Sequence, residues 1–107
     1  MRAISRPIAT GLYVFRVYSP IYSGVLKYFP QALAEVSRTS QAGNDQHHPD
    51  KPLHWDKSKS SDELDALTRH LIDHSVHPVD EDGVLHLSKV AWRALAALER
   101  YLDGQDV

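Results

Sequence analysis

Apolar and polar residues recur along this chain at spacings that predict three helices. In residues 30–42, Leu33 and Val36 lie three positions apart, which places both side chains on one helical face. Pro30 suits the first helical position, because its missing N–H would have no partner there. Gly43 suits the position just past the end, where the backbone often turns left-handed. The first predicted helix therefore covers about residues 30–42.

A capping box marks the start of the second predicted helix. Ser60 is followed three residues later by Glu63, so each side chain can bond the backbone N–H of the other residue. The helix is expected to continue to about residue 73. Its apolar stripe, predicted to face the core, consists of Leu64, Leu67 and Leu71.

The third predicted helix starts near Gly83 and runs to about Asp103, with Gly104 as its stop. The residues predicted to face the core are Leu87, Val90, Ala91, Ala94, Leu98 and Leu102. Another side of this helix carries His86, Lys89, Arg93 and Arg100.

The first thirty residues show weaker patterns. Residues 1–10 are predicted to be a flexible basic arm, residues 11–18 a short extended segment, and residues 22–29 a turn or a brief helix. Residues 11–104 are expected to form a single helical domain of the all-α class. Three amphipathic helices of this length enclose a small core, so we expect a homodimer or homotetramer to complete the bundle.

Composition and charge narrow the function classes. The apolar share of 42% and the charged share of 24% are typical of a globular domain, and the net charge is −2. No nucleic-acid or membrane partner is expected, because the basic residues are few and no apolar run is long enough to span a bilayer. The absence of cysteine is compatible with a reducing cytoplasm.

A polar loop over residues 43–55 separates the first two helices and contains His47, His48 and His54. A loop of this length is uncommon unless it has a function. Zinc is disfavoured, since no cysteine and no second ligand pair at a structural zinc spacing is present. Hydrogen bonding to a polar ligand, or fixing the loop, suits these histidines better. Trp55 at the loop's end either packs in the core or stacks on a base.

Acidic side chains in the second helix offer a possible metal site. Asp62, Asp65 and Arg69 are spaced to project from one helical face. Two carboxylates at that spacing can share Mg²⁺. The same spacing also fits an acid in the first turn beside an exposed Asp65–Arg69 ion pair, and the spacing alone favours this arrangement over a metal site.

An ordered series of short blocks resembles a known family. The blocks are Tyr28-Phe29-Pro30, Ala32-Leu33-Ala34, Val36-Ser37-Arg38, Gly43-Asn44-Asp45-Gln46-His47, Leu53-His54-Trp55, Lys59-Ser60, Asp65, Arg69-His70-Leu71, Asp82-Gly83, Leu85-His86 and Ala91-Trp92-Arg93-Ala94-Leu95-Ala96. In this order they look like the dATP/dGTP diphosphohydrolase family of phages and prophages, which is related to the MazG-type all-α pyrophosphohydrolases. The resemblance covers about residues 12–102. It implies a MazG-like helical bundle, in a bacterial host cytoplasm if a phage encodes the chain.

The resemblance also implies a reaction. A purine deoxynucleoside triphosphate, dATP or dGTP, would be hydrolysed to monophosphate and pyrophosphate with Mg²⁺ or Mn²⁺. The catalytic and metal-binding residues implied are Glu35, Asp62 and Asp65. The substrate-binding residues implied are Asn44, Asp45, His47, Trp55, Lys59, Arg69, His70, His86 and Arg93.

One departure from the MazG pattern keeps two alternatives open. Such enzymes carry E-x-x-E on the first helix, whereas here Arg38 stands three residues after Glu35. The first alternative is a protein that binds or sequesters a nucleotide without cleaving it. The second is a phage protein-interaction module that uses the histidine loop.

Overall fold

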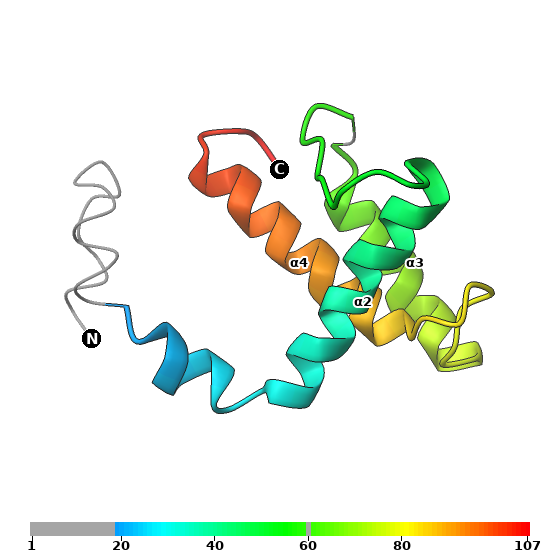
Figure 1. Cartoon of the computed structure of the whole chain (residues 1–107), viewed down its shortest axis with the longest axis horizontal. Coiled ribbons are helices and arrows are strands. Elements are labelled where there is room, and N and C mark those ends of the chain that lie inside the picture. The colour runs from blue at the N-terminus through cyan, green and yellow to red at the C-terminus, as the bar shows by residue number, and fades with distance from the viewer. Residues whose placement is uncertain (1–18, 60) are drawn as a thin grey trace. The chain divides into compact units, whose positions relative to one another are not determined.

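The computed structural model describes residues 19–59 and 61–107 (Figure 1). The chain divides into two compact units, Met1–Pro30 and Gln31–Val107. The basic arm and the extended segment predicted for residues 1–18 lie outside the described residues. The described part is helical, with the order η3, α2, α3 and α4, which confirms the all-α class.

A π-helical turn, η3 (Tyr22–Leu26), forms the brief helix expected in residues 22–29. The backbone N–H of Lys27 donates to the carbonyl of Tyr22 at 2.9 Å, closing the wide turn. The N–H of Gly24 donates to the carbonyl of Pro20 at 2.7 Å. A proline has no N–H of its own to offer, but its carbonyl can begin such a turn.

Helix α2 (Pro30–His47) begins at the predicted proline and runs five residues beyond the predicted end at residue 42. Gly43 therefore lies inside the helix, and the prediction that it ends the helix was wrong. Side-chain bonds explain the extension, because Gln41 Nε2 donates to Asp45 Oδ1 at 2.8 Å, one turn later. The irregular loop begins at His48, whose N–H still donates to the carbonyl of Asn44.

Helices α3 (Glu63–Val76) and α4 (His86–Leu102) pack against each other. Helix α4 ends as predicted, with Gly104 in the left-handed region at φ 88°. Gly83, at φ 83°, instead belongs to the tight turn before α4. Two bonds shape that turn: Asp80 N–H donates to the carbonyl of Val84, and His86 N–H to that of Pro78.

The packed face of α3 and α4 is more polar than the pattern predicted. The leucines expected in the α3 core are displaced outward: Leu64 is 49% exposed and Leu71 is 50% exposed. The buried residues are instead Glu63 and Ala66, which precede Leu64 and Leu67 in the sequence and so lie about 100° from them around the helix. The predicted core stripe of α3 was therefore wrong for Leu64 and Leu71, while Leu67 is partly buried.

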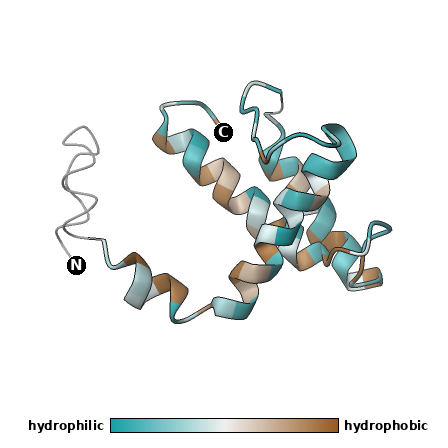
Figure 2. Cartoon of the chain, in the orientation of Figure 1, coloured by the Kyte–Doolittle hydropathy of each residue, from teal (hydrophilic) through white to brown (hydrophobic). Residues whose placement is uncertain are grey.

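Helix α4 shows the same rotation. Leu87 and Leu98 are about half exposed, whereas His86 and Arg100 are buried. Small residues at Ala96 and Ala97 allow the helices to approach closely. The stripe predicted to lie away from the core thus faces inward. Apolar residues, brown in Figure 2, recur along α4, and Leu95 and Leu98 among them are about half exposed.

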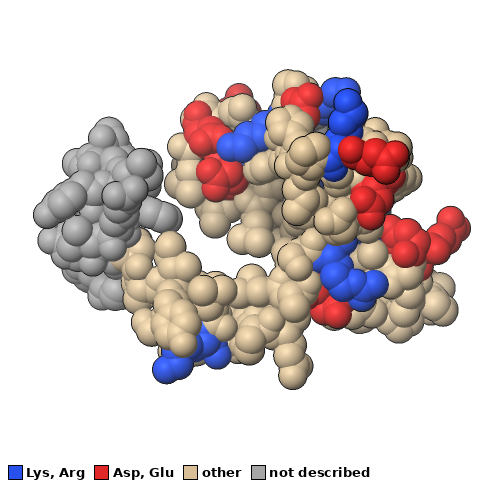
Figure 3. Space-filling view, viewed as in Figure 1, with Lys and Arg blue, Asp and Glu red and all other residues tan. Residues whose placement is uncertain are grey.

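Charged side chains of both signs are intermixed on the face of Gln31–Val107 shown in Figure 3. Among the described residues, no helix is both long and apolar enough to cross a bilayer. Because charges of both signs are intermixed on this face, binding depends on individual charged side chains and not on the charge of the face as a whole.

Candidate functional site

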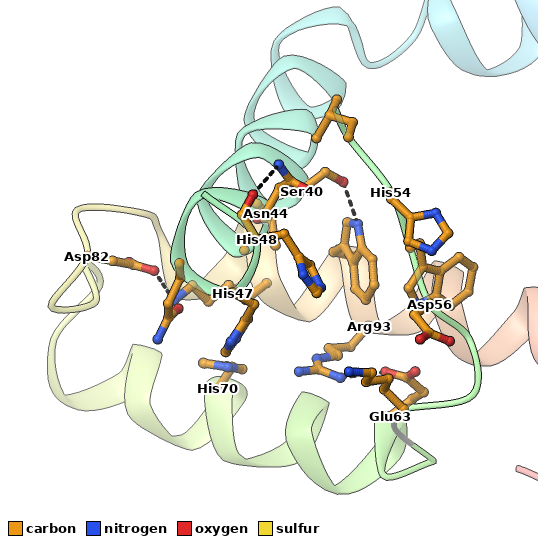
Figure 4. Close-up of a pocket in the computed structure, with 18 residues that line it drawn as sticks. Ser40, Asn44, His47, His48, His54, Asp56, Glu63, His70, Asp82 and Arg93 are labelled. Carbon is orange, nitrogen blue, oxygen red and sulfur yellow. Dashed lines mark hydrogen bonds and ion pairs between the residues drawn. The ribbon is translucent and has the colours of Figure 1, made fainter. Parts of the chain in front are cut away.

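A cavity of about 870 Å³ opens between α2, the loop after it, α3 and α4 (Figure 4). This volume lies in the range of sites that hold a small molecule, roughly 300–1,000 Å³. The lining residues are Thr39, Ser40, Gly43, Asn44, Gln46, His47, His48, Leu53, His54, Trp55, Asp56, Lys59, Glu63, His70, Asp82, Lys89, Trp92 and Arg93.

Two tryptophans form an aromatic wall. The rings of Trp55 and Trp92 meet edge to face, with centroids 5.4 Å apart and planes at 72°. Trp92 Nε1 donates to Ser40 Oγ at 2.8 Å and so ties α4 to α2. Lys57 Nζ lies 5.1 Å from the Trp55 centroid, a distance at which the ring face attracts a cation. Indole faces of this kind can stack on a planar base.

Asn44 fixes the loop that follows α2. The residue is buried, and its Nδ2 donates to the carbonyl of Lys51 at 2.8 Å. This bond holds the loop across the end of α2 and brings the histidines over the cavity. The loop passes through Asp50, which adopts a left-handed conformation at φ 66° that aspartate tolerates better than most residues.

A buried carboxylate lies at one end of the cavity and binds two arginines. Glu63 is 1% exposed, and its Oε1 accepts from Arg93 Nη1 at 2.6 Å. Its Oε2 accepts from Arg100 Nε at 3.0 Å. Arg100 also donates to Gln105 Oε1 and to the carbonyl of Lys57. The guanidinium of Arg93 remains partly exposed on the cavity surface, where it can meet an anion.

Two histidines meet where α3 packs on the start of α4. His70 Nδ1 and His86 Nδ1 are 3.0 Å apart, and the rings are tilted by 36°. Burial lowers the pKa of His70, and the charges of Lys89 and His86 add to the effect. Neutral imidazole is therefore favoured at His70, and the two Nδ1 atoms lie within hydrogen-bonding distance of each other.

An ion-pair cluster borders the histidines. Lys89 Nζ lies 2.6 Å from Asp80 Oδ2 and 2.7 Å from Asp82 Oδ2. The hydrogen bond from Lys89 lowers the pKa of Asp80 despite partial burial. Burial alone would lower the pKa of Lys89, but its bonds to both carboxylates raise it above its usual value. All three side chains are thus charged at neutral pH.

Six of the predicted substrate-binding residues line the cavity: Asn44, His47, Trp55, Lys59, His70 and Arg93. His86 is buried behind His70. The other two do not line it. Asp45 bonds Gln41 on the exposed surface of α2, and Arg69 pairs with Asp62 at 3.4 Å.

The predicted catalytic and metal-binding acids are not gathered at one point. Glu35 pairs with Arg38 at 3.2 Å on exposed α2. Asp62 precedes α3 and lies 3.9 Å from Arg93 Nη1, and Asp65 is exposed. Within residues 19–59 and 61–107, none of the three belongs to a group of side chains close enough to share an ion.

Several cavity residues escaped prediction. Glu63 was interpreted as a helix cap, yet its side chain points into the interior and bonds Arg93 and Arg100. Ser60, its expected partner, lies outside the described residues, and Asp62 is the N-cap. The signal available in the sequence was the pair of arginines seven residues apart, which places both on one face of α4. Lys89 and Trp92 lie on that half of the helix as well.

A family model described as "dATP/dGTP diphosphohydrolase, N-terminal" matches residues 20–107. The chain belongs to this family. The match confirms the resemblance drawn from the ordered blocks, and the family's name points to a hydrolase. No curated protein and no solved structure matches the chain. The cavity lies entirely within the matched residues.

Proposed function

We propose that the cavity binds a purine deoxynucleoside triphosphate and that the chain hydrolyses it between the α- and β-phosphates. Water would add across the bond between the α-phosphorus and the bridging oxygen, releasing monophosphate and pyrophosphate. The observation that carries this proposal is the pairing of an aromatic wall with cationic side chains in one cavity of a dATP/dGTP diphosphohydrolase family member.

The aromatic wall suits the base. Trp55 and Trp92 offer indole surface, and stacking of a base on an aromatic side chain contributes about 1–3 kcal/mol. His47, His48 and His54 line the neighbouring surface and provide ring nitrogens for hydrogen bonds to the base or sugar.

The cationic end suits the triphosphate. Arg93 and Lys59 both line the cavity, so their charges can meet phosphate oxygens. Glu63 holds the Arg93 guanidinium by one nitrogen and leaves other N–H groups to bond the ligand. Bonds of this charge-assisted kind are stronger than neutral ones, at about 1.5–3 kcal/mol.

The expected Mg²⁺ or Mn²⁺ does not fit the residues first expected to hold it. These ions take several oxygen ligands at short range. Glu35 lies in a surface ion pair on α2, and Asp62 already contacts Arg69 and Arg93. Glu35, Asp62 and Asp65 therefore do not offer a shared set of ligands for such an ion.

The test is a hydrolysis panel. Untagged protein would be incubated with each deoxynucleoside triphosphate, with and without divalent ions, and the products separated by ion-exchange chromatography. We expect monophosphate and pyrophosphate in equal amounts from dATP or dGTP. Lys59→Met and Arg93→Met should each weaken the apparent affinity tenfold or more, since about 1.4 kcal/mol is a factor of ten. Arg38→Met, on the surface of α2, is the matched control. Folded protein that turns over no nucleotide would refute hydrolysis.

Binding without cleavage is the second candidate, and the scattered acids favour it. It shares the cavity and predicts that nucleotide is recovered intact after incubation and denaturation. A thermal shift with dATP or dGTP but no release of pyrophosphate would select this candidate.

We further propose that a second copy of the chain covers the outward leucines. Leu95 is 52% exposed and Leu98 55% exposed, on the side of α4 that faces away from α3's buried carboxylate. Large apolar side chains exposed next to each other favour association with another protein surface. Light scattering on a size-exclusion column should report a dimer or tetramer, and Leu98→Asp should give a monomer. A wild-type monomer at high concentration would exclude the assembly.

A further inference from the structure

We propose that His70, Asp73 and His86 form a binding site for a divalent transition-metal ion of the Zn²⁺ or Co²⁺ type. One ligand atom from each side chain lies within 4.8 Å of the other two. The two Nδ1 atoms are 3.0 Å apart. Zinc–nitrogen bonds are about 2.0–2.1 Å, which puts tetrahedral ligand atoms about 3.3 Å from each other. Only a small opening of the pair would admit the ion.

Two helices hold the three ligands in place. His70 and Asp73 lie three apart on α3, so their side chains project from the same face. His86 is the first residue of α4. Its N–H donates to the carbonyl of Pro78 at 2.9 Å, and an isolated bridge joins Val79 to Leu85 just before it. The site is therefore largely formed before any ion arrives.

The donor set selects the class of ion. Two imidazole nitrogens and one carboxylate suit zinc, cobalt, manganese or iron, whereas Mg²⁺ prefers oxygen alone. An ion between the two Nδ1 atoms would take the place of the contact that now joins them. The carboxylate of Asp80 approaches His86 Nδ1 to 3.9 Å, and Lys89 neutralises part of its charge. With Asp73 and Asp82, acidic groups outnumber cations around the pair, which favours a divalent ion.

The position of the site connects it to the cavity. His70 is a lining residue, so an ion bound there would face the space that the nucleotide is proposed to fill. Three protein ligands leave one position open, as catalytic zinc sites do. Metal binding itself does not depend on the proposed function, because it requires only the three side chains.

The test measures metal binding without nucleotide. Untagged protein would be freed of metal with a chelator and titrated with Co²⁺, following the visible absorption of tetrahedral cobalt. We expect one equivalent to bind, and Zn²⁺ to displace it. We expect weaker Co²⁺ binding from each of His70→Gln, Asp73→Asn and His86→Gln. The loss of affinity should exceed the roughly 10–100-fold that is typical when a residue beside a metal ligand is substituted.

Two control variants sharpen the result. His74→Gln alters another α3 histidine outside the cluster and should bind Co²⁺ like the wild type. Asp65→Asn should also leave Co²⁺ binding unchanged. If Glu35, Asp62 and Asp65 held the metal instead, this substitution would abolish binding. Circular dichroism of every variant establishes that it is folded.

X-ray absorption of the zinc-loaded wild type needs no variant at all. The expected spectrum shows nitrogen and oxygen ligands, with the multiple scattering that imidazole produces. Wild-type protein that binds neither Co²⁺ nor Zn²⁺, or binding that survives in both histidine variants, would overturn the site. Because no nucleotide is present in this experiment, its failure would reject the metal site and leave the hydrolysis proposal standing. Conversely, protein that binds Co²⁺ but hydrolyses no nucleotide would support the metal site and reject hydrolysis.

Discussion

The two ends of the α3–α4 interface are both polar, yet they differ in how completely their groups are satisfied. At one end, both oxygens of Glu63 are bonded to arginine nitrogens, and Arg100 makes further bonds to Gln105 and Lys57. At the other end, His70 and His86 share one contact 3.0 Å long. At the first end both Glu63 oxygens are occupied and, of the two arginines, only Arg93 reaches the cavity, whereas the second end keeps nitrogen atoms that can coordinate a ligand.

The difference assigns separate roles to similar chemistry. A buried carboxylate with two cations stabilises the fold chiefly by avoiding the cost of an unpaired charge. The contact between His70 and His86 involves no buried carboxylate, and its two Nδ1 atoms can bind a ligand instead. We therefore expect substitution of Glu63 to change chiefly stability, and substitutions at the histidine end to change what the protein binds.

The largest effect is expected from Glu63→Ala. The substitution leaves Arg93 and Arg100 without their buried partner and should lower the free energy of unfolding by about 3–5 kcal/mol. Glu99→Ala is the matched control, because Glu99 is exposed and lies 3.9 Å from Lys57. Urea denaturation measures both. A loss below about 1 kcal/mol at Glu63 would remove the distinction between the two ends.

Removal of the metal proposed at the histidine end comes next. An ion present at 100 times its dissociation constant adds about 2.7 kcal/mol to the free energy of unfolding. Chelation should therefore lower the melting temperature of zinc-loaded protein and leave His86→Gln unaffected. Equal melting curves with and without chelator would assign the pair a purely structural role.

Acid should weaken the ion-pair cluster beside the histidines. The folded pKa of Asp80 is held below its usual value of 3.8 by Lys89. The stabilisation that ionised Asp80 provides is therefore fully present above its usual pKa of 3.8. It is lost as the pH falls through the lower pKa that Asp80 has in the folded protein. At neutral pH, Asp80→Asn should cost about 1 kcal/mol. In melts with chelator present, the gap between Asp80→Asn and wild type should close below pH 4. The gap between Lys89→Met and wild type should narrow over the same range, because both substitutions remove the same ion pair.

The smallest effect concerns the link from α4 to α2. Ser40→Ala removes the acceptor of the Trp92 indole N–H and should cost about 0.5–1 kcal/mol. Trp92→Phe removes the donor, so a double-mutant cycle isolates the bond. Additive effects of the two substitutions would show that α2 is held mainly by its loop.

The sequence allowed prediction of the helices better than of their buried faces. Pro30 and Gly104 mark boundaries because each restricts the backbone locally. On α4, however, leucines and polar residues both recur at helical spacing, so one sequence contains two candidate inner faces. The prediction that the apolar face is buried was wrong, because Ala66, Ala96 and Ala97 let the polar stripe pack closely.

The candidate site was predictable only in part, for a related reason. Local blocks identified Asn44, Trp55 and Arg93, which line one cavity. The role of Glu63 depends on a contact with residues thirty or more positions away, which helical spacing does not reveal. Glu35 was expected to approach Asp65 through the fold, but it is engaged on the surface by Arg38.

The central claim, that the cavity is the nucleotide site, can be tested by intrinsic fluorescence. The chain contains two tryptophans, and both line the cavity. Titration with a dGTP analogue that resists cleavage between the α- and β-phosphates should quench their emission to saturation. Lys59→Met should shift the midpoint at least tenfold, and Arg38→Met should not. Unchanged tryptophan emission in folded wild-type protein at millimolar analogue would contradict the account.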